Sequence, residues 1–383
     1  KPKYDSQKQI FIQSFQLLED ANTQLTTLIN AADVSLSGDI FFLERTSGAQ
    51  SALESLKKWQ KVVNTFRLRS LIQLSKKDSD ADLKVKQQFA DILGNSTKYP
   101  IMTSNADNLE YVYNAVNNKY PDNKESFGFD ALRYNLAATW VNNFATLNDI
   151  RVMKVAEPAR GLGNADTSYK SFVGAPTGMD LSTMAAGVQA GKFSLYNRKR
   201  YYDGFTAENT ALLSYSEMCF NIAEAINRGW ATGDAESWYT KGIKASFSFY
   251  GVNDGDNVIT FQRAGAVILA YYVNYTVKFI YNDYLAQTTV KYAGNNTNGL
   301  NQILIQKYLA MGRNSGLEGY YQWRRTGIPA FSEGTGSSAS GKIPLRFQYP
   351  SSELSTNTDN VKSALTSQFG GSDDIFAKMW ILN

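Results

Sequence analysis

The sequence predicts an all-α fold built from tetratricopeptide-like helix pairs, with long irregular loops between them. Apolar residues recur at steps of three and four over several long segments, as expected for helices with one buried face. Residues 213–251 carry two such stripes, separated by a break at Gly229–Gly233. This pair has the length of one tetratricopeptide unit, roughly 34 residues. A helix hairpin cannot bury its apolar stripe alone, so the pair implies stacked neighbours.

Three helices are predicted in the amino-terminal part of the chain. The first covers residues 7–30, the second runs from about Gln50 to Ser75, and the third from about Asp80 to Leu93. Residues 94–130 do not continue the pattern, because Pro, Asn and Asp are frequent there. That composition predicts a long loop region.

The pair at residues 213–251 also carries helix-start signals. Ser214 and Glu217 fit a capping box, with Ser at the N-cap and Glu three residues later. Asp234 is expected to cap the second helix, whose apolar face includes Trp238 as a core residue. Further helices are predicted at residues 130–147, 260–284 and 300–312. From Gly327 onwards, Gly, Ser, Thr, Asn and Pro predict extended segments and loops that wrap over the helices.

Composition excludes several classes of function. The 383 residues include no histidine and one cysteine, Cys219, so histidine-dependent triads, histidine-ligated zinc sites and intrachain disulfides are excluded. We expect no cofactor and no metal site. Asp254 and Asp256 resemble part of a calcium loop, but the liganding glutamate is missing, which favours a solvated turn.

Charge and hydropathy argue against a nucleic-acid partner and a membrane span. Net charge is only +4, and basic runs such as Arg198–Arg200 are short, so no nucleic-acid interface is expected. The longest apolar stretch, Ala264–Val273, is about half the length that a transmembrane helix requires.

Several loop aromatics fit no helical stripe, so the core does not obviously need them. Tyr196, Tyr201 and Tyr202 lie close in sequence to Arg198, and Tyr111 and Tyr113 lie one residue apart near asparagines. Flat rings beside amides and guanidinium groups suit sugar faces and hydroxyls, or peptide backbones equally well. The predicted ligand-binding set is Tyr111, Tyr113, Tyr196, Arg198, Tyr201 and Tyr202. The alternative is ordinary loop packing.

Two glutamates raise the question of catalysis. Glu217 and Glu224 lie seven residues apart on one side of a predicted helix, which allows an acid–base pair for glycoside hydrolysis. The interpretation we favour is that Glu217 caps the helix and Glu224 pairs with an arginine. Arg324–Arg325 is expected to be a structural cluster that pairs with Glu318 or Glu224. The protein is therefore expected not to be an enzyme.

Seven segments, in order along the chain, resemble motifs of the SusD/RagB-like family, and most closely its group two. Departures from the family pattern are Ile150 for proline, Tyr308 for tryptophan, and Tyr320 and Gln322 within the sixth motif. The segments are 59–69 (WQKVVNTFRLR), 148–151 (NDIR), 169–178 (YKSFVGAPTG), 220–230 (FNIAEAINRGW), 305–310 (IQKYLA), 318–329 (EGYYQWRRTGIP) and 343–353 (IPLRFQYPSSE). Each motif alone is weak, but the ordered set covers residues 1 to about 360.

The resemblance implies an outer-membrane lipoprotein at the cell surface that captures oligosaccharide or peptide nutrients. It further implies delivery to a SusC-like, TonB-dependent barrel, with the ligand held between binding protein and barrel. Membrane contact would be made only through a lipid anchor. Because members of the family begin with a lipoprotein signal and a further segment, residues 1–383 are expected to be one SusD-like domain that lacks its amino-terminal part.

Two alternatives from other classes remain open. A helical-repeat adaptor that binds other proteins predicts no small-ligand pocket and no membrane anchor. A carboxylate-based glycoside hydrolase predicts turnover of a polysaccharide that depends on one of the glutamates.

Overall fold

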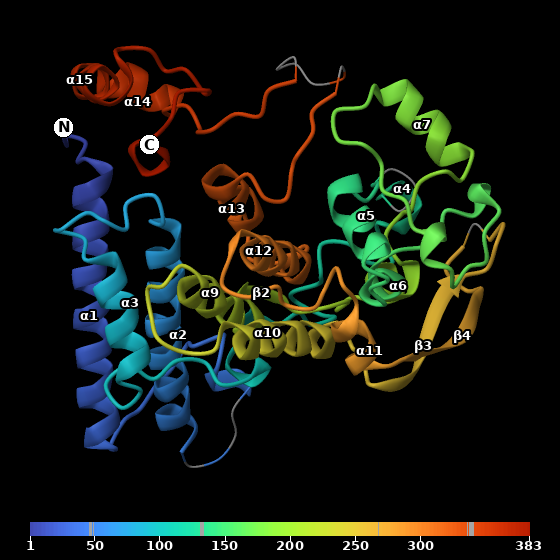
Figure 1. Ribbon diagram of the computed structural model, residues 1–383, viewed down its shortest axis with the longest axis horizontal. Coiled ribbons are helices and arrows are strands. Elements are labelled where there is room, and N and C mark those ends of the chain that lie inside the picture. The colour runs from blue at the N-terminus through green and yellow to red at the C-terminus, as the bar shows by residue number, and fades with distance from the viewer. Residues whose placement is uncertain (46–47, 49, 131–133, 267, 335, 337–340) are drawn as a thin grey trace.

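The computed structural model describes residues 1–45, 48, 50–130, 134–266, 268–334, 336 and 341–383. It is mostly helical, as predicted (Figure 1). The helices are α1 Gln7–Ala31, α2 Ser51–Gln73, α3 Val85–Gly94, α4 Phe127–Asp130, α5 Ala138–Thr146, α6 Arg151–Val155, α7 Leu181–Gln189, α8 Arg198–Tyr202, α9 Tyr215–Asn227, α10 Ala235–Phe249, α11 Tyr281–Ala286, α12 Thr297–Met311, α13 Glu318–Thr326, α14 Ser351–Thr356 and α15 Thr358–Phe369. The strands are β1 Leu109–Tyr111, β2 Thr210–Leu213, β3 Gly255–Gln262 and β4 Tyr272–Phe279.

The long helices α1 and α2 pack side by side at one edge of the molecule (Figure 1). A network of hydrogen-bonded side-chain amides is buried between them. The Asn22 side-chain oxygen on α1 accepts hydrogen bonds from Gln60 Nε2 at 3.1 Å and Asn64 Nδ2 at 2.9 Å, both on α2. A one-turn shift of α1 along α2 would leave these buried amides unpaired, so the amide network fixes how the two helices are aligned.

The predicted helix pair is α9 and α10. Ser214 Oγ accepts from Glu217 N at 3.2 Å, and Asp234 Oδ1 accepts from Glu236 N at 3.0 Å, so both predicted caps are present. The capping box is only half formed, because the Glu217 carboxylate accepts hydrogen bonds from Arg69 and not from the Ser214 backbone N–H. Close approach of the two helices depends on Gly242: a Cβ there would lie 2.8 Å from the Phe220 ring.

Two apolar clusters form the core, one around α5, α10 and β3 and the other around α2, α3 and α9. The prediction that Trp238 belongs to the core needs correction. Trp238 is half-buried at the boundary of both clusters, and Lys241 Nζ lies 4.4 Å from its ring centroid. The Trp238 ring packs against the two clusters on its inner side, and the Lys241 side chain extends over it towards solvent.

The predicted helix at residues 260–284 is wrong for the described residues before α11, which begins at Tyr281; residue 267 lies outside the described part. Strands β3 and β4 form an antiparallel ribbon here, with Gly255 opposite Phe279 and Gln262 opposite Tyr272. Exposure alternates along β3, from 62% at Val258 to 0% at Ile259, which is the period of a strand. The ribbon lies at the opposite edge of the molecule from α1 (Figure 1).

The remaining boundaries agree in part with expectation. The helices predicted at residues 7–30, 50–75 and 300–312 correspond to α1, α2 and α12. The helix predicted from residue 130 begins only at Ala138, and residues 131–133 lie outside the described part. The carboxyl-terminal part was expected to be loops, but it contains α14 and α15; residues 335 and 337–340 of that prediction are also outside the described part. Across the described ranges, no helix has the length and apolar character to cross a membrane.

Candidate functional site

Four of the six predicted ligand-binding residues lie in one chain of rings. We call this the tyrosine cluster: Tyr111, Tyr113, Tyr120, Tyr196 and Tyr201. Ring centroids are 5.4 Å apart for Tyr111–Tyr113, 5.0 Å for Tyr113–Tyr120, 6.3 Å for Tyr120–Tyr201 and 5.4 Å for Tyr196–Tyr201. Residues about 90 positions apart in sequence thus meet at the β1–β2 ribbon and the adjoining loops.

Arg313 lies against the inner end of the cluster. Its guanidinium carbon is 5.5 Å, 4.5 Å and 5.0 Å from the ring centroids of Tyr120, Tyr196 and Tyr201. The guanidinium also pairs with Asp122. Burial alone would lower the pKa of Arg313, but the surrounding rings and this hydrogen bond raise it, so the side chain stays cationic. Cation–π contacts of this kind hold a ring cluster together.

Exposure differs along the cluster. Tyr111 and Tyr113 are half-buried, and the Tyr113 hydroxyl lies 2.9 Å from Thr210 Oγ1. The turn that follows them is exposed, and the Asn114 side-chain oxygen accepts from the backbone N–H groups of Val116 and Asn117 at 3.0 and 2.8 Å. Tyr111 and Tyr113 therefore form the outer end of the cluster, beside the exposed residues Asn114 and Asn117. Tyr196 is also half-buried, but it lies against Arg313 at the inner end.

The premise that the core does not need the loop tyrosines is wrong for Tyr201 and Tyr202. Their exposed fractions are 1% and 0%, so both rings are covered by protein. Tyr202 packs against Phe127, with centroids 5.8 Å apart, away from the cluster. Both residues belong to the five-residue helix α8, which is too short to show an apolar stripe in the sequence.

Arg198 is also a structural residue and lies outside the cluster. It is 7% exposed, and its backbone N–H donates to Glu157 Oε1 at 2.9 Å. Burial raises the pKa of Glu157 to about 7, although Arg198 and two backbone N–H groups oppose the rise. Arg198 and Glu157 therefore anchor α8 to β3, whose Gln262 N–H donates to the same carboxylate at 3.1 Å.

Two residues of this site were not in the predicted set: Tyr120, a member of the cluster, and Arg313, which lies against it. Tyr120 stands in the same predicted loop as Tyr111 and Tyr113, so the same reasoning could have included it. Arg313 follows α12 in a turn where Gly312, Ser315 and Gly316 all have positive φ. No sequence pattern links that turn to the tyrosines, because only the tertiary fold brings them together.

Glu217 and Glu224 are both fully buried and paired with arginines. Glu217 accepts from Arg69 Nε at 2.7 Å, and Glu224 accepts from Arg325 Nη2 at 2.8 Å and Arg228 Nε at 2.8 Å. Burial raises the pKa of each carboxyl, but the arginines outweigh it and lower both, Glu224 to about 2. Neither carboxylate is placed to receive a sugar or a water, so the arrangement does not fit the hydrolase alternative. The predicted pairing of Arg325 with Glu224 is confirmed.

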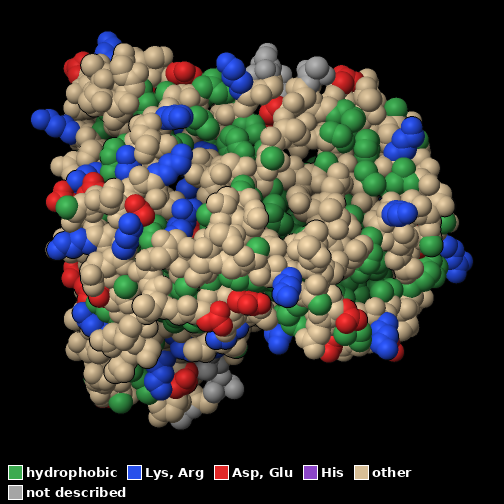
Figure 2. Space-filling model, in the orientation of Figure 1, with side chains coloured by type: hydrophobic (Ala, Val, Ile, Leu, Met, Phe, Trp, Pro, Cys, Tyr) green, Lys and Arg blue, Asp and Glu red, His purple; other side chains and the backbone are tan. Residues whose placement is uncertain are grey.

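Surface hollows among the described residues lie apart from the tyrosine cluster, and one of about 650 Å³ is lined by residues of both chain ends. A shallow groove of about 460 Å³ lies between the chain ends, and another of about 340 Å³ runs along the polar face of α5, where Thr139, Asn142, Asn143 and Thr146 line it. Neither includes a residue of the tyrosine cluster. Basic and acidic side chains are interspersed on the face shown in Figure 2. The described residues contain no group of three acidic, Cys or His side chains that could hold a metal ion.

Comparison with known proteins identifies one protein family. Residues 1–350 match the family model described as "Starch-binding associating with outer membrane", which is the SusD-like group two family. No curated protein matches the chain.

Three solved structures similar to this chain come from Bacteroides species. A SusD homologue of Bacteroides fragilis has 30% identity and a TM-score of 0.81, over 100% of this chain and 76% of that one. An outer-membrane protein of Bacteroides vulgatus, described as involved in nutrient binding, has 29% identity and a TM-score of 0.78, over 100% and 77%. A second Bacteroides fragilis SusD homologue has 27% identity and a TM-score of 0.77, over 100% and 77%. The chain belongs to the SusD-like family of non-catalytic, nutrient-binding proteins that associate with the outer membrane.

Proposed function

We propose that this protein captures an oligosaccharide at the cell surface, and that the outer end of the tyrosine cluster contacts the ligand. Tyr111 and Tyr113 would provide ring faces, and the exposed residues Asn114 and Asn117 would provide amide partners for sugar hydroxyls. The half-buried state of these two rings, beside these exposed asparagines, is the observation that supports the choice of site.

The rest of the cluster has a supporting role in this proposal. Tyr120 and Tyr201 are buried, and Arg313 binds their faces and that of Tyr196. A ring that is already held in place loses little conformational entropy when a ligand stacks on it. The buried inner end therefore preorganises the exposed outer end.

An oligosaccharide is favoured over a peptide because of the family and the chemistry of the surface. The matching family is described as starch-binding. Rings with uncharged amides suit a neutral polyol, and the nearby Arg313 is already neutralised by Asp122. We further propose that a lipid anchor holds the protein at the outer membrane, and that a SusC-like, TonB-dependent barrel receives the ligand.

A binding screen tests this function. The protein is titrated by calorimetry with starch, chitin, fructan and mannan oligosaccharides and with mixed peptides, each at matched concentration. Saturable binding of at least one oligosaccharide class, without release of shorter products, is the expected result. Binding of peptides alone, or release of products from any glycan, contradicts the proposal. Binding of neither class contradicts it too and favours the adaptor alternative.

A further inference from the structure

The edge of β3 that faces away from β4 is closed by side chains. The outward carbonyl groups of this strand accept hydrogen bonds from Lys154 Nζ to Val258 O at 3.0 Å, from Asn197 Nδ2 to Thr260 O at 3.0 Å and from Arg160 Nη2 to Gln262 O at 2.7 Å. The Gln262 N–H on the same edge donates to Glu157. With these groups occupied, β3 cannot accept a further strand.

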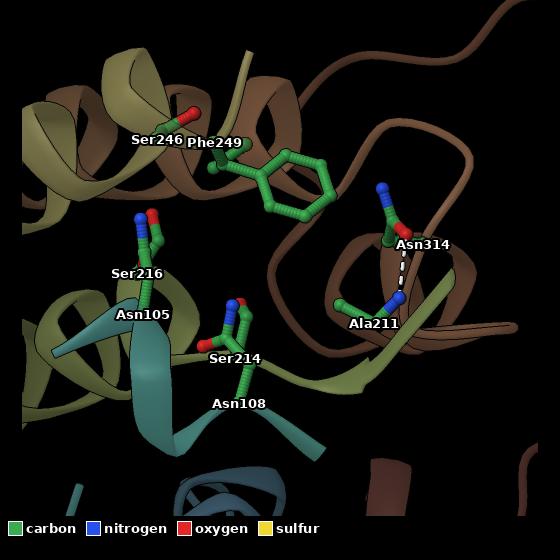
Figure 3. A pocket seen from close by; sticks show the side chains of 9 residues that line it. Asn105, Asn108, Ala211, Ser214, Ser216, Ser246, Phe249 and Asn314 are labelled. Carbon is green, nitrogen blue, oxygen red and sulfur yellow. Dashed lines mark hydrogen bonds between the residues drawn. The ribbon is translucent and has the colours of Figure 1, made fainter. Parts of the chain in front are cut away.

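The β1–β2 ribbon is also closed at β2. Asn314 Oδ1 accepts from Ala211 N at 2.8 Å, as the dashed line in Figure 3 shows, and Ser315 N donates to Ala211 O at 2.8 Å. The turn after α12 thus occupies both backbone groups of Ala211. Covering an edge in this way prevents another chain from pairing with it.

The outer edge of β4 is open. Residues directly opposite one another in an antiparallel ribbon point their backbone groups either at each other or both away. Thr276 lies opposite Val258 and Asn274 opposite Thr260, so Thr276 and Asn274 point their N–H and C=O groups outwards. Both are exposed, and no other described element bonds to their backbone groups. This edge faces away from the rest of the molecule (Figure 1).

We infer that the open edge of β4 pairs with β4 of a second copy of this chain, antiparallel across a two-fold axis. One register pairs all four outward residues: Tyr272 then lies opposite Lys278, and Asn274 lies opposite Thr276. Each such pair exchanges two backbone hydrogen bonds. The result is a continuous sheet with strand order β3–β4–β4–β3.

Charge complementarity favours a second copy over a strand of another protein. Lys278 is exposed and is the one charged residue of β4. A lysine on an edge strand normally discourages pairing. In the symmetric register, Lys278 of the second copy lies beside the Tyr272 ring, whose hydroxyl donates to Asp203 at 3.0 Å. Self-pairing therefore gives this charge an aromatic ring and a nearby carboxylate, and no like charges face each other.

The other face of β4 is self-complementary too. Val273, Tyr275 and Val277 are half-buried on the side that faces the core. The same register places Val273 opposite Val277 and Tyr275 opposite its own copy. Cross-strand pairs of β-branched and aromatic residues stabilise a sheet. This inference does not depend on the proposed function.

Sedimentation equilibrium of the full chain tests the inference, at concentrations up to about 100 µM, where weak dimers form. Wild type should approach twice the mass of one chain. Thr276→Pro removes an outward N–H that the ribbon does not use, and it should weaken association by about tenfold or more. Thr276→Val keeps that N–H and is the control. Lys278→Glu, at an exposed position, should also weaken association, because it brings a carboxylate towards Asp203.

Each outcome decides the matter. Wild type that stays monomeric overturns the inference and leaves the edge to a strand of another protein. Thr276→Pro that associates as tightly as wild type shows that the interface lies elsewhere, and if that variant does not fold, Lys278→Glu decides in the same way. Hydrogen exchange gives a second reading: the N–H groups of Asn274 and Thr276 should exchange more slowly as concentration rises, whereas that of Tyr275, which faces β3, should not change. Exchange that does not depend on concentration contradicts the pairing.

Discussion

The buried ion pair between Glu224 and Arg325 should be a major contributor to stability. Side-chain exposure is 0% for Glu224 and 1% for Arg325, and the pair joins α9 to α13. Glu224→Gln keeps the shape of the side chain but leaves Arg325 buried without its counter-charge. Breaking a buried pair by removing one partner costs about 3–5 kcal/mol.

The pKa of Glu224 gives an independent magnitude. Its fall from the ordinary 4.5 to about 2 corresponds to roughly 3 kcal/mol at neutral pH, at about 1.4 kcal/mol for each pKa unit. The unfolding entropy of a 383-residue chain is about 0.8 kcal/mol per kelvin, at about 2.1 cal/mol/K per residue. A loss of 3–5 kcal/mol therefore lowers the melting temperature by about 4–6 °C.

The assay is urea unfolding at pH 7 and pH 3, followed by tryptophan fluorescence. Because the folded-state pKa is depressed, the contribution is present above pH 4.5 and is lost as pH falls towards 2. The difference in stability between wild type and Glu224→Gln should therefore narrow at pH 3. Glu54→Gln is the matched control, since Glu54 pairs with Lys57 and both side chains are about half exposed; it should cost less than about 1 kcal/mol. If Glu224→Gln unfolds like Glu54→Gln at pH 7, the reasoning is refuted.

Three further predictions follow from packing and burial. Trp238→Ala should cost less than the roughly 3–5 kcal/mol of a fully buried aromatic, because Trp238 is half-buried; a larger loss in urea unfolding would count against that placement. Gly242→Ala should destabilise the fold by about 1–3 kcal/mol, since the added methyl would lie 2.8 Å from the Phe220 ring. Gly94→Ala is the control and should not destabilise it, because there is open space at its Cβ. Equal melting temperatures for the two variants would show that α9 and α10 can move apart to accept the methyl group. The pKa of Glu157 is raised to about 7, so the folded state binds the proton of this carboxyl more tightly than the unfolded state does. The stability that this proton contributes is present below pH 4.5 and is lost as pH rises through 7. Glu157→Gln should remove that part of the pH dependence of the unfolding free energy, and an unchanged pH profile would contradict the prediction.

Helices were predictable where the apolar period is long enough to read. α1, α2, α9, α10 and α12 each extend over at least three turns, and each packs one side against the core, although Ile10, Leu17 and Leu28 of α1 are exposed. The β3–β4 ribbon was missed because a half-buried ribbon of Val, Ile, Tyr and Phe also contains residues spaced three and four apart. At such short lengths, tertiary pairing decides between helix and strand.

The candidate site was predictable only in part, for a physical reason. Position outside any helical stripe singled out Tyr111 and Tyr113, and the structure leaves both rings half-buried. That position could not separate them from Tyr201 and Tyr202, whose burial depends on neighbours far away in the chain, such as Phe127. Arg313 joins the cluster through a turn with positive φ, and that long-range contact leaves no local pattern.

The central claim is that the outer end of the tyrosine cluster contacts an oligosaccharide. The most direct test is calorimetric titration of the oligosaccharide found in the screen into wild type, Tyr111→Ala, Tyr113→Ala and the control Tyr271→Ala. Tyr271 is 49% exposed and lies beside β4, outside the cluster. At least one cluster variant should weaken binding by about 1 kcal/mol or more, the scale of a binding hot spot, with its melting temperature nearly unchanged and the control binding like wild type. If both cluster variants also bind like wild type, the ligand site lies elsewhere on the protein and the claim is wrong.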